Sequence, residues 1–327
     1  MDEAGDAASR NRLGSAWARF WFAEVDGLPL AVVRVGFSSA ALCAWAGTLP
    51  HIPLYYSDFG DFPIAFARAW GSEWFGRLLM PDMLGGATAA MLLAALYGAA
   101  LVAFLVGWRT RTMGVATCFL TYWFHHRNPS FLTAGDSVLH LSSLYLAAGF
   151  LFVAPVDRAL SVDRLRALGG HVASIDLLGP TRVPAWPIRL IQIQVAVIYS
   201  VSGFWKLADS SWRNGTALWI ALASPTFSRF GPPGIAPQVP FAVGTLAGAA
   251  WEFLFPLLVW TRATRRGALL VGLAMHFFIL VFLNIGVFPL VMIALYPAFL
   301  RAEELRALWR IGTRRTSHPP TTPSASS

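Results

Sequence analysis

The sequence is poor in charge and almost without lysine. Only 13% of its 327 residues are charged, about half the share of a typical soluble domain. Hydrophobic residues make up 56%, and Lys206 is the only lysine among 25 basic residues. This composition excludes an ordinary soluble domain and predicts an integral membrane protein, whose first partner is the lipid bilayer.

Cysteine is also scarce, and the motifs of several enzyme classes are missing. Cys43 and Cys118 both lie inside apolar stretches, without a CxxC pair or a Cys/His cluster. A disulfide framework, a redox dithiol and a metal site are therefore not expected. The sequence also has no phosphate-binding loop and no nucleophile elbow. Its Gly-rich stretch 231–234 has the composition of a turn rather than of a nucleotide site.

What the sequence does contain is a series of long apolar windows. Measured against the roughly 20 residues that cross a bilayer, they predict an all-α, polytopic helical bundle of about eight spans. The windows are about 29–49, 84–107, 113–126, 137–154, 187–206, 239–260, 267–283 and 285–300. We expect one membrane domain over 28–300, an N-terminal segment 1–27 and a disordered tail 301–327, which is rich in Ser, Thr and Pro from residue 313 onward.

The placement of arginine predicts the orientation. Of the 25 basic residues, 18 fall on the side that holds both termini, and six fall on the other side. Cytoplasmic loops carry such an excess. Both termini are therefore expected in the cytoplasm, with the chain in the cell (inner) membrane. The same clustering between apolar windows argues against nucleic acid as the partner of the basic residues.

Two outer connections carry aromatic residues at helical spacing. Phe62, Phe66, Trp70 and Trp74 recur every four residues, which predicts an amphipathic helix in the outer interface. The apolar residues Trp212, Leu218, Trp219 and Leu222 predict either a second such helix or a re-entrant segment. We expect the two elements to cover one cavity that opens outward.

Lys206 ends the apolar segment Ile188–Trp205. One interpretation is a lysine whose stem snorkels and anchors a helix end. The other is a base, because lysine can lose its proton and arginine cannot. The use of lysine here, in a chain that otherwise uses arginine, favours the base.

Other polar residues fall within the apolar windows. His276 in the seventh window is either a core residue or an acid–base group that lines a cavity. Glu252 in the sixth window is expected to be protonated or paired. The patch that holds His125, His126, Asn128 and Asp136 is either a solvated turn or a lining of the cavity at the level of Lys206.

Four segments together resemble the HTTM domain, the membrane part shared with vitamin K-dependent γ-carboxylase. They are Ile191–Phe227, which includes Tyr199 and Trp212, His126–Leu141, Pro155–Leu165 and His276–Phe299. The resemblance implies that Lys206 is a catalytic base, that His276 is a second catalytic residue, and that Asn128 is a polar group of the active site. It also implies reduced vitamin K or another quinol as cofactor, in a cavity to which His126, Asp136, Tyr199, Trp212 and Glu252 contribute.

The sequence departs from the carboxylase at several positions. Pro129 and Trp205 stand where the animal enzyme has a histidine and a second lysine. We also expect the protein to lack the extracytoplasmic substrate-binding part of that enzyme. The leading hypothesis is a quinone-linked, carboxylase- or epoxidase-type lyase. The alternative is a maturation or export factor for a secreted peptide, of the sporulation-delaying-toxin type, working with a small accessory subunit. A transporter is disfavoured because the sequence suggests neither paired intramembrane charges nor an internal repeat.

Overall fold

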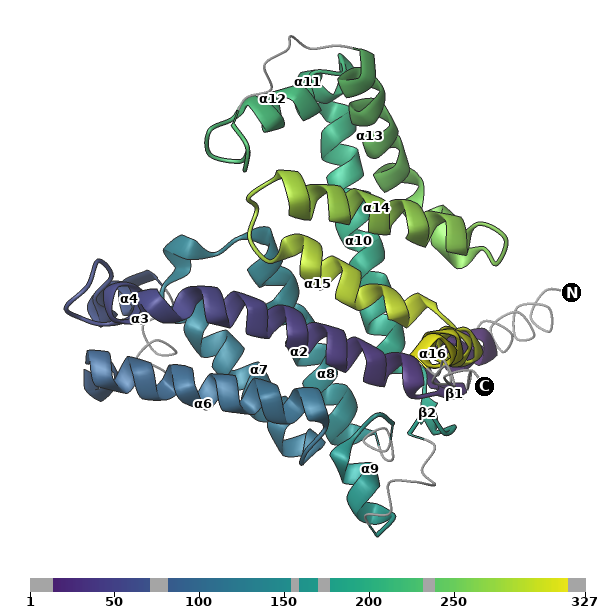
Figure 1. Ribbon diagram of the computed structural model, residues 1–327, viewed down its shortest axis with the longest axis horizontal. Coiled ribbons are helices and arrows are strands. Elements are labelled where there is room, and N and C mark those ends of the chain that lie inside the picture. The colour runs from purple at the N-terminus through teal and green to yellow at the C-terminus, as the bar shows by residue number, and fades with distance from the viewer. Residues whose placement is uncertain (1–13, 71–81, 154–158, 170–176, 232–238, 317–327) are drawn as a thin grey trace, which may run out of the picture.

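The computed structural model describes residues 14–70, 82–153, 159–169, 177–231 and 239–316, and these are mostly helical (Figure 1). The long helices are α2 (Leu28–Thr48), α6 (Ala87–Val106), α7 (Thr110–Arg127), α8 (Ala134–Phe152), α10 (Trp186–Ala208), α13 (Val239–Trp260), α14 (Arg265–Phe282) and α16 (Ala302–Thr316). The shorter helices are α3 (Ile52–Tyr56), α4 (Ile64–Trp70), α9 (Val162–Ala167), α11 (Ser210–Arg213), α12 (Ala217–Ala223) and α15 (Phe288–Leu295), with 3₁₀ turns at Leu49–His51, Asp82–Leu84, Pro129–Phe131 and Tyr296–Phe299.

Five helical segments are long and apolar enough to cross a membrane. They are Leu28–Tyr56, Ala87–Val106, Trp186–Ala208, Val239–Trp260 and Arg265–Phe282, followed by the shorter apolar helix Phe288–Phe299. The third and fourth predicted windows also form helices, α7 and α8, but these two are not among the five. The all-α class is therefore confirmed, while the number of crossings stays a prediction.

Helix α2 lies in the middle of the core. Its residues Leu30, Val33 and Phe37 are fully buried, and it packs against α6, α8 and α15. The indole nitrogen of Trp45 donates to the carbonyl of Ala94 on α6 over 2.8 Å. Most side chains in this part of the core are aliphatic or aromatic, so burial of apolar surface holds it together.

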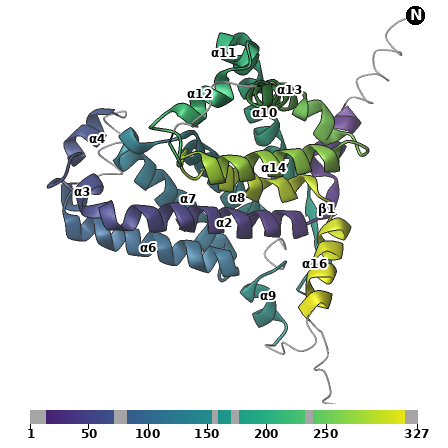
Figure 2. The same ribbon diagram turned by 45° about the horizontal axis from the view of Figure 1, so that its top comes forward.

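Helices α10 and α13 pack along each other and cross the direction shared by α2, α6 and α14 (Figure 1). The C-terminal end of α10, beside α11 and α12, therefore lies at a different edge of the molecule from α3 and α4 in both views (Figure 2). The two outer elements predicted from aromatic spacing do form helices, α4 and the pair α11 and α12. They pack on different partners, so our expectation that they cover one cavity is wrong; Trp74 lies outside the described residues.

The segments at the two ends of the chain meet each other. Strand β1 (Glu24–Asp26) pairs antiparallel with β2 (Arg182–Pro184), and Nη2 of Arg306 on α16 lies 2.5 Å from Oδ2 of Asp26. Residues 302–316, which the sequence places in a disordered tail, form helix α16. Its first turn is held by Glu304, which accepts hydrogen bonds from Arg265, Arg266 and the backbone of Arg301. Residues 317–327 lie outside the described residues.

The last two predicted windows form a tight hairpin. Helix α14 ends at Phe282 and α15 begins at Phe288. Gly286 between them has a φ of +66°, a conformation that glycine adopts without steric cost. The hairpin carries His276 on its first helix and is followed by Tyr296, so it sets the distance between these two side chains.

Candidate functional site

Lys206 forms an ion pair with Glu252. Its Nζ lies 2.5 Å from Oε1 of Glu252, and Ser202 Oγ donates to Oε2 over 2.7 Å. Only 6% of the Glu252 side chain and 22% of the Lys206 side chain are exposed. Glu252 is thus paired, one of the two alternatives that the sequence left open, and the expectation that the apolar helices carry no paired charges is wrong.

Helix geometry brings these groups together. Ser202 and Lys206 are four residues apart and share the face of α10 that packs on α13. Gly203 lies between them, and a Cβ at this position would be 2.6 Å from the backbone nitrogen of Phe253. The absence of a side chain at Gly203 allows the two helices to approach closely enough for the hydrogen bonds to Glu252.

A cavity of about 500 Å³ adjoins the ion pair. Its lining includes Lys206, Ser202, Asp209 and the indoles of Trp205 and Trp212. The Lys206 Nζ lies 4.4 Å from the centre of the Trp212 ring, within the range of a cation–π contact. Asp209, which caps α11, is a second carboxylate at this cavity. Hydrogen bonds from Ser211 lower the pKa of Asp209.

A buried chain of hydrogen bonds joins α10, α14 and the 3₁₀ turn that follows α15. The hydroxyl of Tyr199 is 2.6 Å from Nε2 of His276 and 2.6 Å from the hydroxyl of Tyr296. The Tyr199 hydroxyl has one proton, so it can donate to only one of these two neighbours. All three side chains are buried, and Nδ1 of His276 has no hydrogen-bond partner. Tyr199 lies seven residues before Lys206 on α10, two turns along one face.

The predicted polar patch lies elsewhere, beside a second cavity of about 670 Å³. Asn128, Asp136 and His125 line it, and it shares no lining residue with the cavity at Lys206. The expectation that this patch and Lys206 face one cavity is therefore wrong. The reason is the crossing of α10, which carries Lys206 to another edge of the molecule (Figure 1).

Within the patch, two residues have evident local roles. Asp136 accepts from the backbone and hydroxyl of Thr133 at 2.8 and 2.7 Å, which closes a capping box at the start of α8. Asn128 is buried, donates to the carbonyl of Tyr55 over 2.7 Å and accepts from Ser130. Asn128 and Asp136 thus fix the connection between α7 and α8.

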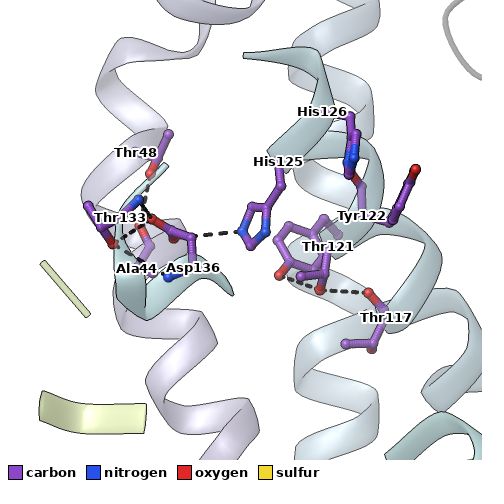
Figure 3. A network of polar contacts seen from close by, with 10 residues as sticks. Ala44, Thr48, Thr117, Thr121, Tyr122, His125, His126, Thr133 and Asp136 are labelled. Carbon is purple, nitrogen blue, oxygen red and sulfur yellow. Dashed lines mark hydrogen bonds and ion pairs between the residues drawn. The ribbon is translucent and has the colours of Figure 1, made fainter. Parts of the chain in front are cut away.

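The two neighbouring histidines face different surroundings (Figure 3). His125 reaches toward Asp136, with 3.7 Å between Nε2 and Oδ1. His126 stacks on Tyr122 with ring centres 3.8 Å apart, and its Nδ1 lies 2.9 Å from the Tyr122 carbonyl. His126 does not line either of these two cavities.

Sequence reasoning missed Ser202, Gly203 and Tyr296. The first two could have been found from helical spacing, because Tyr199, Ser202, Gly203 and Lys206 follow the i, i+3, i+4, i+7 pattern of one face. Tyr296 follows α15 and reaches Tyr199 over 97 residues of sequence. No local pattern indicates that contact.

A mostly helical domain with five helical segments long and apolar enough to cross a bilayer has the features of a membrane protein. The chain matches the HTTM domain over residues 22–303 and therefore belongs to the HTTM domain family. This agrees with the resemblance seen in the sequence and is consistent with a membrane protein like the vitamin K-dependent carboxylase. Comparison with curated proteins and with solved structures gave no match.

Proposed function

We propose that the chain crosses the cell membrane eight times, with both termini in the cytoplasm. The 18 basic residues on one side support this orientation. The contact between Arg306 and Asp26 supports an even number of crossings, because it joins the two terminal segments. Fusions to alkaline phosphatase, which folds only outside the cytoplasm, test the orientation. We expect the phosphatase to be inactive when fused after residue 316 and active when inserted at Gly231. The reverse pattern would overturn the orientation.

We further propose that Lys206 is the base of a quinol-linked reaction of the carboxylase or epoxidase type. The observation that carries this proposal is the Lys206–Glu252 pair at a cavity with indole walls. Such a cavity fits a flat aromatic head group, since Trp205 and Trp212 offer ring faces and Ser202 offers a hydroxyl. Reduced vitamin K or another quinol, when bound, would supply the reducing equivalents and the strong base of the carboxylase reaction.

The residues of the chain would hold and move one proton. Transfer of a proton from the Lys206 ammonium to Oε1 of Glu252 gives a neutral amine, and this amine accepts a proton from a hydroxyl in the cavity and becomes an ammonium again. Glu252 then holds the first proton, while Ser202 keeps its carboxyl group oriented through Oε2. The ring of Trp212 covers the ammonium on its other side. In this scheme Glu252 is part of the acid–base pair.

The test is oxidation of a reduced quinone by dioxygen, catalysed by the full chain reconstituted in vesicles. Lys206→Arg is the informative variant, because it retains the charge and the snorkelling stem but removes a titratable amine. We expect Lys206→Arg and Lys206→Ala to lose at least about 100-fold in rate, the lower range for general acid–base catalysis. Arg68→Ala, on the separate helix α4, is the control and should retain full activity.

Two outcomes would contradict the base. Unchanged activity of Lys206→Arg would show that the residue serves as a positive charge that anchors the end of α10 and not as a base. Maturation or export of a secreted peptide that needs the chain but consumes no quinol would support the alternative function, a maturation factor with a small accessory subunit.

A further inference from the structure

A third cavity, away from Lys206, lies between α14, the segment α15 to Phe299, and α16. Its volume is about 630 Å³ and its walls are almost entirely apolar. The apolar lining includes Leu269, Leu270, Leu273, Ile293, Pro297 and Leu308. Leu270 and Leu308 are 66% and 59% exposed, so the groove is open along its length. We call it the α14–α16 groove.

One end of the groove carries an excess of positive charge. Glu304 pairs with both Arg265, at 3.0 Å, and Arg266, at 2.7 Å. One carboxylate therefore faces two guanidinium groups. The Arg266 side chain lines the groove and is 70% exposed, whereas that of Arg265 is only 14% exposed. Arg266 is thus the cation that a ligand in the groove would meet.

Helix α16 has the features of a helix that lies at a membrane surface. Trp309, which is 55% exposed, stands beside Leu308. Tryptophan is enriched at the depth of lipid head groups. The charged end of the groove and α16 therefore belong at one membrane–water boundary.

We propose that the α14–α16 groove binds one anionic phospholipid of the cytoplasmic leaflet, with its acyl chain along Leu270 and Leu273 and its phosphate at Arg266. The groove is an apolar channel that ends at an exposed cation, so it matches both the acyl chain and the phosphate of that lipid. This inference rests on the proposed membrane orientation and is independent of the quinol chemistry at Lys206.

A second copy of the chain fits this groove less well. In the common two-fold symmetric dimer, a contact centred on the charged end would place Arg266 opposite its own copy, and like charges repel. A phospholipid instead brings the opposite charge to Arg266. Basic clusters on the cytoplasmic side of a membrane segment attract anionic lipids in this way.

Native mass spectrometry of the full chain, released from vesicles with equal amounts of phosphatidylglycerol and phosphatidylcholine of the same acyl length, tests the proposal. We expect phosphatidylglycerol to be retained preferentially. Arg266→Gln is expected to weaken its retention about fivefold, the effect of one basic residue at an anionic surface. Arg266→Lys should preserve the preference, and Leu270→Trp, which fills the groove, should reduce retention of both lipids.

Arg262→Gln is the matched control. Arg262 is an exposed residue of the turn before α14, four residues from Arg266, and does not line the groove. Equal retention of the two lipids by the unaltered chain would overturn the proposal. An equal loss in Arg262→Gln and Arg266→Gln would also overturn it, because it would show a general attraction of the basic surface. Phosphatase fusions report the orientation separately, so a wrong orientation is distinguishable from an empty groove.

Discussion

Nζ of Lys206 and Oε1 of Glu252 lie 2.5 Å apart between α10 and α13, and they join the only lysine of the chain to a carboxylate that is 6% exposed. An isolated charge at this depth would be costly. The pair reduces that cost, and it also gives Lys206 a neighbour that can share its proton. Structural and chemical roles therefore overlap in these two residues.

The pair predicts a thermodynamic coupling. Lys206→Met leaves Glu252 without its cation, and Glu252→Gln leaves the ammonium without its anion. We expect each single substitution to destabilise the fold and the double substitution to cost less than their sum, with a coupling of about 1–3 kcal/mol. Thermal denaturation of the four proteins in detergent measures it. Strictly additive effects would show that the pair contributes nothing to stability.

Gly203 predicts a steric effect on the same pair. A Cβ there would lie 2.6 Å from the backbone nitrogen of Phe253, so Gly203→Ala must push α10 and α13 apart. The expected loss is about 1–3 kcal/mol in the free energy of unfolding, together with lower quinol oxidation. Gly248→Ala on α13 is the control, because nothing lies within 4 Å of a Cβ there. Equal stability of the two variants would contradict the close approach.

The hydrogen-bond chain predicts an order of effects. Tyr199→Phe removes both contacts and leaves His276 and Tyr296 unpaired in the core, whereas Tyr296→Phe removes only one contact. Burying an unsatisfied polar group costs about 1–3 kcal/mol. We therefore expect a lower melting temperature for Tyr199→Phe than for Tyr296→Phe. The opposite order would show that Tyr199 does not connect the other two side chains.

Asp163 predicts a pH dependence outside the membrane segments. Burial by itself raises the pKa of Asp163. The net shift is nevertheless downward, because the carboxylate accepts hydrogen bonds from the backbone and hydroxyl of Thr110 and from the backbone of Arg109, and lies near the charge of Arg166. The unfolded chain therefore binds the proton more tightly. The carboxylate stabilises the fold above its pKa in the unfolded chain, and this stabilisation is lost as the pH falls through the lower native pKa.

The variant Asp163→Asn tests that dependence. We expect a loss of about 1 kcal/mol in the free energy of unfolding at pH 7, a modest value because the site is partly exposed. The difference from the unaltered chain should narrow as the pH falls below about 4. Glu303→Gln, in the exposed first turn of α16, is the control. A difference that is the same at pH 7 and at pH 3 would contradict the role of the charge.

The sequence by itself determined the class and the family of this protein. Long apolar windows permit helices that satisfy their own backbone hydrogen bonds in lipid, so composition and length were enough to predict an all-α membrane fold. Lys206 was conspicuous as the only lysine, and Tyr199 was named within the segment that resembles the HTTM domain. These are local properties, which a linear pattern records.

Only the tertiary structure decided what these residues contact. Glu252, the partner of Lys206, is 46 residues away in the sequence, and Tyr296, a partner of Tyr199, is 97 residues away. Gly203 lets α10 and α13 approach each other through backbone packing, which no local pattern records. The crossing of α10 also separated Lys206 from Asn128 and Asp136, which the sequence places at one level. Periodicity gives the face of a helix, whereas its direction in the bundle depends on how side chains from distant segments pack together.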